Sequence, residues 1–248
     1  MNKNDITIII ATSVLPSHPS TKIIDETISN IRTHFPKNEI ILQMDGLREE
    51  RLNRKQDYDE YKSKVLWKCL HEWFNVLPII FDEHSHQSTM MRKTIDIIDT
   101  PLMLYVEGDA PLTPDMEIDW DKCINLIKNK KANTVRFHFE SVIPKEHEHL
   151  MFGLEDGFMK TSQWSQRPHL STVKYYKHEI LPPLEDKVFI EDTTHGKVQE
   201  DCKHEGWESH KLWIYHPEGG NIKRSYHLDG REGTQKFTSD DDAWGYKE

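Results

Sequence analysis

The amino-acid sequence predicts an α/β fold built around a mainly parallel sheet flanked by helices. Two observations predict it. Short apolar runs, typical of buried strands, alternate along the first half with segments of helical periodicity. The 248 residues are also enough to bury one sizeable core. We therefore expect a single domain over residues 1–248, with a regular half over 1–110, a loop-rich half over 111–235 and a polar tail over 236–248.

The elements of the first half follow from their periodicity. Residues 6–11 are a β-branched run, which predicts the first strand. Ile24, Ile28 and Ile31 follow at spacings of four and three residues, which place them on one face of a helix. Strands that alternate with helices imply parallel neighbours joined by crossovers. The same reasoning predicts strands over 39–44, 76–81 and 102–107, a long helix carrying residues 58–73 and a helix over 88–98.

The second half is less regular. We expect a short helix over 121–130 and a strand over 134–139. From residue 143 onward the sequence is rich in proline, histidine, tryptophan and glycine. Long irregular segments in a compact domain are often binding loops, so this half is the expected place for a second substrate.

Composition narrows the class of protein. Hydrophobic residues make up 36% of the chain, charged residues 30%, and the formal net charge is −10, which disfavours indiscriminate binding to nucleic acid. No apolar run is long enough to cross a bilayer, and the N-terminus lacks a signal-peptide layout, so we expect a cytoplasmic protein without a membrane partner. The three cysteines form no C-x-x-C pair, which disfavours disulfides and thiolate zinc sites. The sequence gives no indication of oligomeric state.

Three basic clusters stand out against this acidic background. Each is typical of a solvated face, and each is also able to hold phosphate. The clusters are Arg48, Arg51, Arg54 and Lys55; Lys128, Lys130 and Lys131; and Lys223, Arg224 and Arg231.

The most informative motif is the acidic corner Glu107-Gly108-Asp109, which ends the apolar run 102–106. Carboxylates at the carboxyl end of a buried strand lie where open α/β sheets bind ligands. They suit a hard divalent cation, Mn²⁺ or Mg²⁺, which takes oxygen ligands and leaves positions open for phosphates. The alternative is an ordinary acidic turn after a strand.

The common glycine-rich phosphate cradles are missing. The chain has no G-x-G-x-x-G after its first strand and no G-x-x-x-x-G-K-[ST], which disfavours a Rossmann dehydrogenase or a P-loop enzyme. A nucleotide can still be held by strand-end side chains, with a metal neutralising its diphosphate. Asp45, Glu107 and Asp109 would supply such a site.

Several motifs occur in a fixed order along the chain. They are an isoleucine-rich first strand, a strand ending Met44-Asp45-Gly46, an arginine in the helix before the fourth strand, the corner Glu107-Gly108-Asp109, and a later Phe189-Ile190-Glu191-Asp192. This ordered set, which covers residues 5–230, resembles the GT-A glycosyltransferases of family 2. The resemblance implies a GT-A, Rossmann-like fold in which residues 1–110 bind a nucleoside diphosphate sugar, by family likeness a UDP-sugar, and residues 111–235 bind the acceptor.

The resemblance also implies roles at the donor. The corner matches the D-x-D motif, with Asp109 as the metal ligand. Glu107, which stands for the first Asp, is implied as a contact to the ribose or sugar of the donor. The remaining implied donor contacts are Asp45 at the nucleoside, Thr12 and Ser13 at the base pocket, and Arg92 at the sugar or phosphates; the alternative for Arg92 is a surface arginine.

The pair Glu191-Asp192 resembles the acidic pair in which Asp is the catalytic base of inverting members. A carboxylate that takes the proton of an acceptor hydroxyl contributes roughly 10²–10⁴-fold to the rate. Asp192 is the expected base and Glu191 the alternative, while the metal would act as a Lewis acid on the departing nucleoside diphosphate. The competing interpretation is an acidic helix start, with Asp192 or Thr193 capping a helix that runs through Val198.

Members of the family that this chain resembles often have a further metal or phosphate ligand, a histidine near the C-terminal end of the domain. His216 and His227 are the candidates, and His227 is preferred as a metal ligand. Lys223 and Arg224 lie beside it and are expected to clamp phosphate. The pairs His84/His86 and His147/His149 have zinc-like spacings, which we attribute to chance in a chain with 15 histidines.

An aromatic and basic cluster predicts the acceptor site. Its members are Trp164, Arg167, His169, Tyr175 and Tyr176, and the alternative for them is core packing. Residues 216–224 resemble small soluble glycosyltransferases of tailed phages, some of which glycosylate hydroxymethylated cytosine. This resemblance implies 5-hydroxymethylcytosine in double-stranded DNA as the acceptor, with glucosyl or arabinosyl transfer in the host cytoplasm. The competing hypotheses are a glycosyltransferase acting on a surface polysaccharide or other glycan, and a non-catalytic sugar-nucleotide-binding module.

Overall fold

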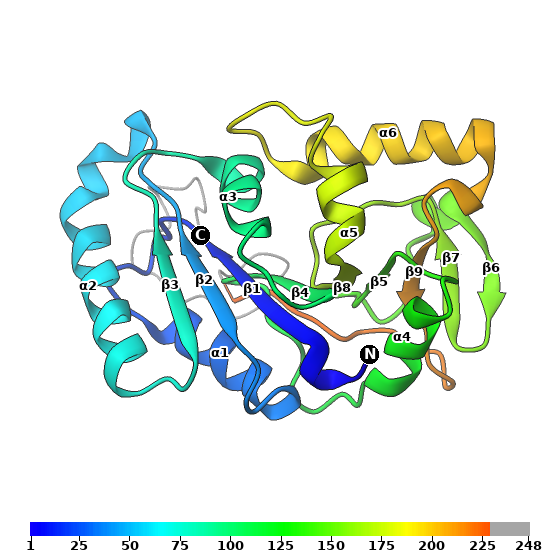
Figure 1. Ribbon diagram of the computed structural model, residues 1–248, viewed down its shortest axis with the longest axis horizontal. Helices are drawn as coiled ribbons and strands as arrows, with labels where there is room; N and C mark the ends of the chain where they lie inside the picture. The colour runs from blue at the N-terminus through cyan, green and yellow to red at the C-terminus, as the bar shows by residue number, and fades with distance from the viewer. Residues whose placement is uncertain (229–248) are drawn as a thin grey trace.

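The computed structural model describes residues 1–228, which form one nine-stranded sheet with helices on both of its faces (Figure 1). The strand order is β3-β2-β1-β4-β8-β5-β9-β7-β6. Within these residues, seven strands run in one direction and two, β7 and β8, oppose them. The strands are β1 Ile6–Thr12, β2 Ile40–Met44, β3 Val76–Ile80, β4 Leu102–Glu107, β5 Thr134–Arg136, β6 Met151–Glu155, β7 Phe158–Thr161, β8 His169–Thr172 and β9 Leu212–Tyr215.

Six α-helices lie within the described residues. They are α1 Lys22–His34, α2 Lys55–His71, α3 His86–Ile95, α4 Trp120–Lys128, α5 Val173–Tyr175 and α6 Ile190–Glu205. A π-helical segment, Tyr176–Ile180, extends α5. Short 3₁₀ helices cover Lys3–Asp5, Glu49–Arg54, Lys145–Leu150 and Trp207–Ser209.

The sheet is buried on both faces, and alternate residues of β1 show how. Ile8 and Ile10 belong to the core shared with α1, α2 and α4. Ile9 and Ala11 belong to the core shared with α3, α5 and α6. A strand covered on both faces is apolar at every position, which explains the unbroken isoleucine run.

The structure confirms the strands and helices expected in the first half, with ends that shift by a few residues. In the second half β5 ends at Arg136, three residues earlier than expected. The irregular region from residue 143 contains four strands, β6 to β9, and the long helix α6, so it is less loop-rich than expected. Three of these strands have only four residues, too few for a period-two pattern to show. The polar tail expected at 236–248 lies outside the described residues.

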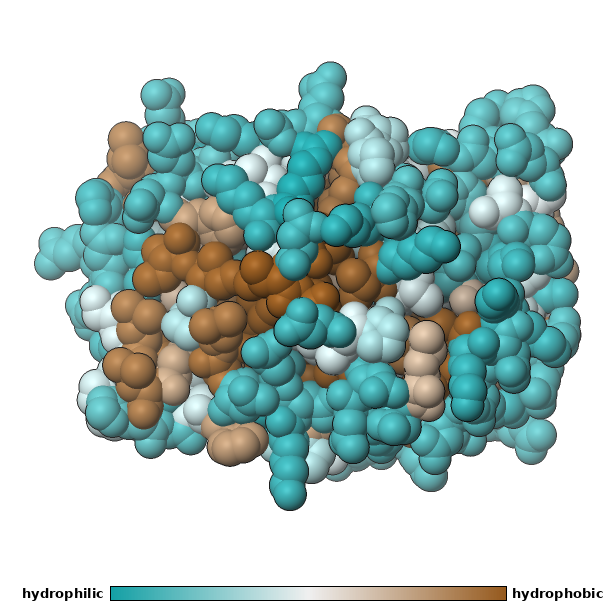
Figure 2. Space-filling view, viewed as in Figure 1, coloured by the Kyte–Doolittle hydropathy of each residue, from teal (hydrophilic) through white to brown (hydrophobic). Residues whose placement is uncertain are grey.

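Hydrophobic and hydrophilic residues are unevenly distributed over the face of the molecule seen in Figure 2. Apolar side chains gather over the area where Figure 1 draws β1 to β3, and most of the remaining face is hydrophilic (Figure 2). In β3, Leu77 is 45% exposed and Ile80 is 38% exposed. Of the helices within residues 1–228, none combines the length and apolar content required to cross a bilayer.

Candidate functional site

A cavity of about 640 Å³ opens at the carboxyl ends of β1, β2 and β4. This is the edge at which open α/β sheets bind ligands. The cavity brings together predicted residues from both halves of the chain, namely Thr12, Ser13, Asp45, Glu107 and Asp109 from the first, and Arg167, Glu191, Asp192 and His227 from the second.

The acidic corner is held tightly in place. The Gly108 N–H donates to the Ala11 carbonyl at 2.9 Å, and the Thr27 hydroxyl donates to the Gly108 carbonyl at 2.7 Å. A Cβ at Gly108 would lie 2.6 Å from Cγ2 of Thr12, closer than side-chain atoms normally approach. Glycine is therefore required here by the proximity of β1, and the corner presents its two carboxyls in a fixed arrangement.

The two acids of the corner have different surroundings. Oε1 of Glu107 accepts a hydrogen bond from Nε2 of Gln87 at 2.7 Å. Burial and, next, the negative charge of Asp109 raise the pKa of Glu107 to about 8. The carboxylate of Asp109 is half-buried and accepts no hydrogen bond from residues 1–228. At pH 7 Glu107 therefore mostly keeps its proton, and the open carboxylate of Asp109 carries the negative charge of the corner.

These residues fit a divalent cation in part. The open carboxylate of Asp109, beside the carboxyl of Glu107, offers the oxygen ligands that such an ion prefers. However, within residues 1–228 no three side chains of histidine, cysteine, aspartate or glutamate converge as a metal-binding group. His227 lines the cavity, but its Nε2 contacts the guanidinium of Arg167. His216, the other candidate, does not line the cavity.

The carboxylate of Asp45 is engaged by the chain itself. Oδ1 accepts the backbone N–H groups of Gly46 at 2.8 Å and Ser85 at 2.7 Å. Oδ2 accepts the N–H of His86 at 3.1 Å and lies 3.0 Å from Nδ1 of His84. Asp45 is only 2% exposed. Asp45 thus organises the loop between β3 and α3, and its role as a contact to the nucleoside stays a prediction.

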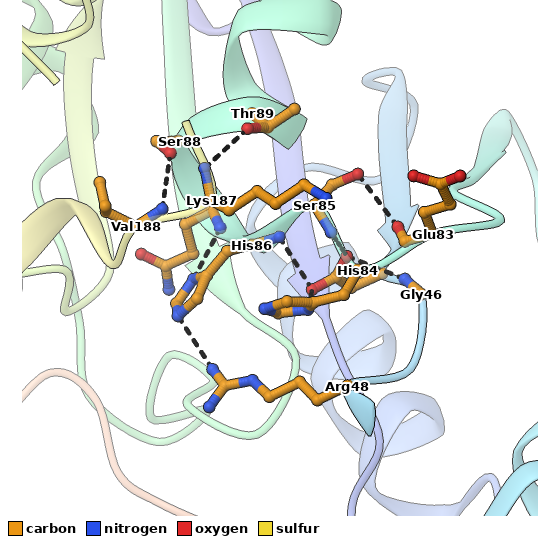
Figure 3. A network of polar contacts seen from close by, with 12 residues as sticks. Gly46, Arg48, Glu83, His84, Ser85, His86, Ser88, Thr89, Lys187 and Val188 are labelled. Carbon is orange, nitrogen blue, oxygen red and sulfur yellow. Dashed lines mark hydrogen bonds and ion pairs between the residues drawn. The ribbon is translucent and has the colours of Figure 1, made fainter. Parts of the chain in front are cut away.

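His84 in this loop and His86 at the start of α3 line the cavity together with Arg48 from the loop after β2 (Figure 3). His86 has φ +55°, a left-handed conformation that costs a non-glycine residue about 1–2 kcal/mol. Nη2 of Arg48 lies 2.9 Å from Nε2 of His86. Burial and, next, the charge of Arg48 lower the pKa of His86 to about 4. The ring is therefore neutral at pH 7, and the spacing of His84 and His86 is explained by this loop rather than by chance.

The start of α3 also holds the segment that enters α6 (Figure 3). The Lys187 N–H donates to the Thr89 hydroxyl at 2.9 Å, and the Val188 N–H donates to the Ser88 hydroxyl at 3.0 Å. Two residues beyond Val188, α6 begins. Asp192 therefore approaches the cavity from a segment that is fixed against the other half of the chain.

Glu191 and Asp192 differ in the hydrogen bonds that their carboxylates accept from the described part of the chain. Oε2 of Glu191 accepts the Gln166 N–H at 2.6 Å and the Ser165 hydroxyl at 3.2 Å. Asp192 is exposed and has no hydrogen-bond or ion-pair partner in residues 1–228. The helix start that was the competing interpretation of this motif is present, since α6 begins at Ile190 with Phe189, not Asp192, as its N-cap. Asp192 is the carboxylate that remains open to a ligand.

Three residues that were predicted to contact the phosphates or the sugar of the donor lie away from the cavity. The guanidinium of Arg92 contacts the carboxylate of Asp186 and the carbonyls of Leu181 and Leu184, which favours the alternative of a helix surface arginine. Arg224 is 6% exposed and donates to the carbonyl of Glu117 at 2.9 Å. Lys223 pairs with His138 in an isolated β-bridge. None of the three lines the cavity, so the cavity lining gives no support to the prediction that they bind the donor.

The expected acceptor cluster is divided. Arg167 lines the cavity and stacks on the Phe139 ring, with 3.7 Å between Cζ and the ring centroid. Trp164 is 2% exposed and His169 is fully buried. Nδ1–H of His169 donates to the Arg167 carbonyl at 2.7 Å, and its Nε2 accepts from the Tyr176 hydroxyl at 2.6 Å. Trp164 and His169 are therefore core residues that support Arg167.

Two features of the site escaped sequence reasoning. His18 stacks on Tyr61 with 3.8 Å between ring centroids, and both rings line the cavity. Gln87 links Glu107 to Gln166, whose Nε2 donates to Oε1 of Gln87 at 3.3 Å. The Ser/Pro/His composition of residues 13–20 was a weak signal for the first feature. A lone glutamine carries no signal for the second, because its role depends on a partner far away in sequence.

Comparisons with known proteins show the fold. No protein-family model matches the chain, and no curated protein matches it in sequence. A Staphylococcus aureus TarS fragment in complex with UDP-GlcNAc superposes with a TM-score of 0.53 at 11% identity, covering 91% of this chain and 58% of that one. UDP-glucose pyrophosphorylase complexed with UDP-glucose gives a TM-score of 0.53 at 11% identity, over 96% and 98%.

A third similar structure is the mannosyltransferase PcManGT from Pyrobaculum calidifontis in complex with GDP-Man and Mn²⁺, with a TM-score of 0.50 at 11% identity, over 88% of this chain and 58% of that one. The chain thus spans less than two thirds of the two glycosyltransferase chains. Together these likenesses confirm the expected α/β, GT-A-like fold.

Proposed function

We propose that the chain is a metal-dependent, inverting glycosyltransferase that moves a sugar from a nucleoside diphosphate sugar, a UDP-sugar, to an acceptor hydroxyl. One observation carries the proposal. Asp109 from the end of β4 and Asp192 from the first turn of α6 are both open carboxylates, and both line the same cavity. Two carboxylates with separate roles, one at the leaving group and one at the nucleophile, are what this reaction requires.

The donor is assigned to the wall formed by the first half. His18 and Tyr61 offer stacked aromatic faces, and the loop with Thr12 and Ser13 lies beside them in the cavity lining. Aromatic faces of this kind accept a nucleobase. Asp109, with Glu107, would hold the divalent cation, which stabilises charge on the departing diphosphate when it is bound. The similar structures that contain UDP-GlcNAc, UDP-glucose or GDP-Man support a donor of this class.

The acceptor step is assigned to Asp192. Its carboxylate takes the proton of the acceptor hydroxyl as the hydroxyl oxygen attacks C1 of the sugar. The bond from C1 to the phosphate oxygen breaks, and the nucleoside diphosphate leaves with both bonding electrons. Attack on the face opposite the leaving group inverts the configuration at C1.

The favoured acceptor is 5-hydroxymethylcytosine in phage DNA, with glucosyl or arabinosyl transfer. The resemblance to phage enzymes supports it, and so do Arg48 and Arg51 at the cavity. Arg54, from the same cluster, is instead buried against the carbonyls of Pro16 and His18. The net charge of −10 favours a surface polysaccharide or other glycan as the alternative acceptor. A nucleotide-release assay with hydroxymethylated duplex DNA against saccharide acceptors separates them, and absence of DNA binding even at low salt excludes the first.

A second candidate is a sugar nucleotidyltransferase, because the similarity to UDP-glucose pyrophosphorylase spans 98% of that chain. Such an enzyme releases pyrophosphate from UTP and a sugar 1-phosphate, whereas a glycosyltransferase releases UDP from a UDP-sugar. Measuring both products with the wild-type chain distinguishes the two. Binding of a UDP-sugar with neither product formed would identify a non-catalytic binding module instead.

A further inference from the structure

Both ring nitrogens of His86 face hydrogen-bond donors. Nδ1 accepts the backbone N–H of Gln87 at 2.9 Å, and Nε2 lies 2.9 Å from Nη2 of Arg48 (Figure 3). A neutral imidazole carries one N–H and one lone pair, so it accepts at only one of its two nitrogens. In either tautomer, one N–H of the ring points at another donor. Protonation of the ring would leave neither contact satisfied.

Of the two contacts made by the His86 ring, the one with Arg48 is the one that is able to change. The Gln87 N–H is part of the first turn of α3, and Asp45 fixes the preceding N–H of His86 at 3.1 Å. Arg48 is an exposed side chain in the loop after β2. With Nδ1 engaged by Gln87, the ring carries its proton on Nε2, and Nε2–H is then directed toward a guanidinium.

The positive charge of Arg48 is also not neutralised by the described part of the chain. No carboxylate of residues 1–228 lies within ion-pair distance of it. Asp45 lies at the start of the same loop, but its carboxylate oxygens are already engaged by Gly46, Ser85, His86 and His84. The N-terminus of α3 adds the positive end of a helix dipole at the same place. Two N–H groups and an uncompensated charge therefore converge at the cavity.

We propose that Arg48 and His86 form a binding site for a phosphate group of the acceptor. A phosphate oxygen between the two side chains accepts N–H from Arg48 and from Nε2 of His86, while Nδ1 keeps its bond from Gln87. Every donor then has an acceptor. Charge-assisted bonds from arginine to phosphate are among the stronger hydrogen bonds in proteins.

The position of His86 assigns this phosphate to the acceptor rather than to the donor. The His86 ring centroid lies 6.0 Å from that of Phe189, which is the N-cap of α6 and lies three residues before Asp192. This step rests on the proposed function, in which Asp192 receives the proton of the acceptor hydroxyl and the diphosphate of the donor lies at Asp109. The substrate class is thus an acceptor with a phosphate monoester or diester near the hydroxyl that is glycosylated.

The test uses inorganic phosphate as the probe, without divalent metal, and follows the imidazole nitrogens by ¹⁵N NMR. We expect phosphate to bind and to shift the His86 Nε2–H signals, because Nε2–H then donates to a phosphate oxygen instead of facing the guanidinium, while the ring stays the Nε2–H tautomer. Arg48→Ala should weaken phosphate binding tenfold or more, and Arg48→Lys should weaken it less. Lys55→Ala, which removes the same charge from an exposed position nearby, is the matched control and should leave binding unchanged. Dimethyl phosphate in the same titration distinguishes a diester from a monoester as the bound group.

Three results would overturn the inference: no change at His86 on addition of phosphate, equal losses in Arg48→Ala and Lys55→Ala, or a loss of UDP affinity in Arg48→Ala as large as the loss of phosphate affinity. The last result would assign the site to the donor. Failure of the proposed function has a different signature, because wild-type protein would then not bind UDP at all, whatever the His86 signals show.

Discussion

Ser88 and Val188 hydrogen-bond each other reciprocally: the Val188 N–H donates to the Ser88 hydroxyl at 3.0 Å, and the Ser88 N–H donates to the Val188 carbonyl at 3.2 Å. The two residues are 100 positions apart in sequence. The pair joins the first turn of α3, which lines the cavity, to the segment that leads into α6. The position of Asp192 at the cavity is thus set partly by this contact.

Removal of the Ser88 hydroxyl tests this coupling. Ser88 is fully buried, so Ser88→Ala leaves the Val188 N–H without its partner and should destabilise the fold by about 1–3 kcal/mol. We expect kcat to fall more than UDP affinity, because Asp192 is displaced and the donor wall is not. Urea unfolding and steady-state kinetics measure the two effects. Ser63→Ala, on the exposed face of α2, is the control, and an equal effect of both variants would contradict the coupling.

The glycine of the acidic corner should not tolerate a methyl group. Gly108→Ala places a Cβ 2.6 Å from Thr12 Cγ2, and such overpacking typically costs about 1–3 kcal/mol. Because the shift falls on the corner itself, nucleotide affinity should decrease as well. Gly196→Ala in α6 meets nothing within 4 Å and should be neutral or stabilising by up to about 1 kcal/mol. Thermal unfolding of both variants checks the contrast, which disappears if the corner is free to move.

Asp192 and Glu191 should respond differently to neutralisation. Asp192→Asn removes the proposed base and should lower kcat by roughly 10²–10⁴-fold with UDP affinity retained. Glu191→Gln keeps an oxygen that is able to accept the Gln166 N–H, so its kcat should change less than tenfold. Single-turnover rates and UDP titrations of both variants provide the measurement. A larger loss in Glu191→Gln would make Glu191 the base.

Two buried histidines should make the fold sensitive to acid. Burial and, next, the charge of Arg54 lower the pKa of His18 to about 3, and burial lowers the pKa of His169 to about 4. The unfolded chain protonates these groups near the ordinary pKa of about 6.5, whereas the folded chain does not. Between pH 6.5 and pH 4 the unfolded state binds more protons, so stability falls as the pH falls.

Urea unfolding at pH 7, 6 and 5 measures this slope. His169→Gln should show a shallower loss between pH 6.5 and 4 than the wild type, although its stability at pH 7 is lower because the Tyr176 and Arg167 contacts change. A stability that is independent of pH over this range, or one that rises toward pH 5, would contradict the prediction.

The first half of the fold was predictable because its signals are local. The isoleucine run of β1 and the spacing of Ile24, Ile28 and Ile31 indicate directly which residues are buried. The end of the apolar run of β4 indicates where the acidic corner lies. In the second half β7 and β8 have four residues each. Strand β8 pairs with the distant β4, and β7 pairs with the distant β9 as well as with its neighbour β6, so pairing rather than pattern defines them.

Sequence reasoning brought several acids and one arginine to the cavity lining, while their roles stay predictions. Asp109 follows the end of β4, Asp192 lies in the first turn of α6, and both line the cavity together with Arg167. Arg92 was expected to face the donor, but helical spacing does not show which side of α3 meets Asp186. Asp45 was placed correctly at the end of β2, yet its engagement depends on Ser85 and His86, which only the folded loop brings to it.

The most direct test of the proposed function is a crystal structure of the chain soaked with Mn²⁺ and UDP. We predict that the ion is bound by Asp109, that the diphosphate lies beside it, and that uracil occupies the cavity near His18 and Tyr61. Density for the ion and the nucleotide at another place, with the carboxylate of Asp109 facing only solvent, would contradict the proposal.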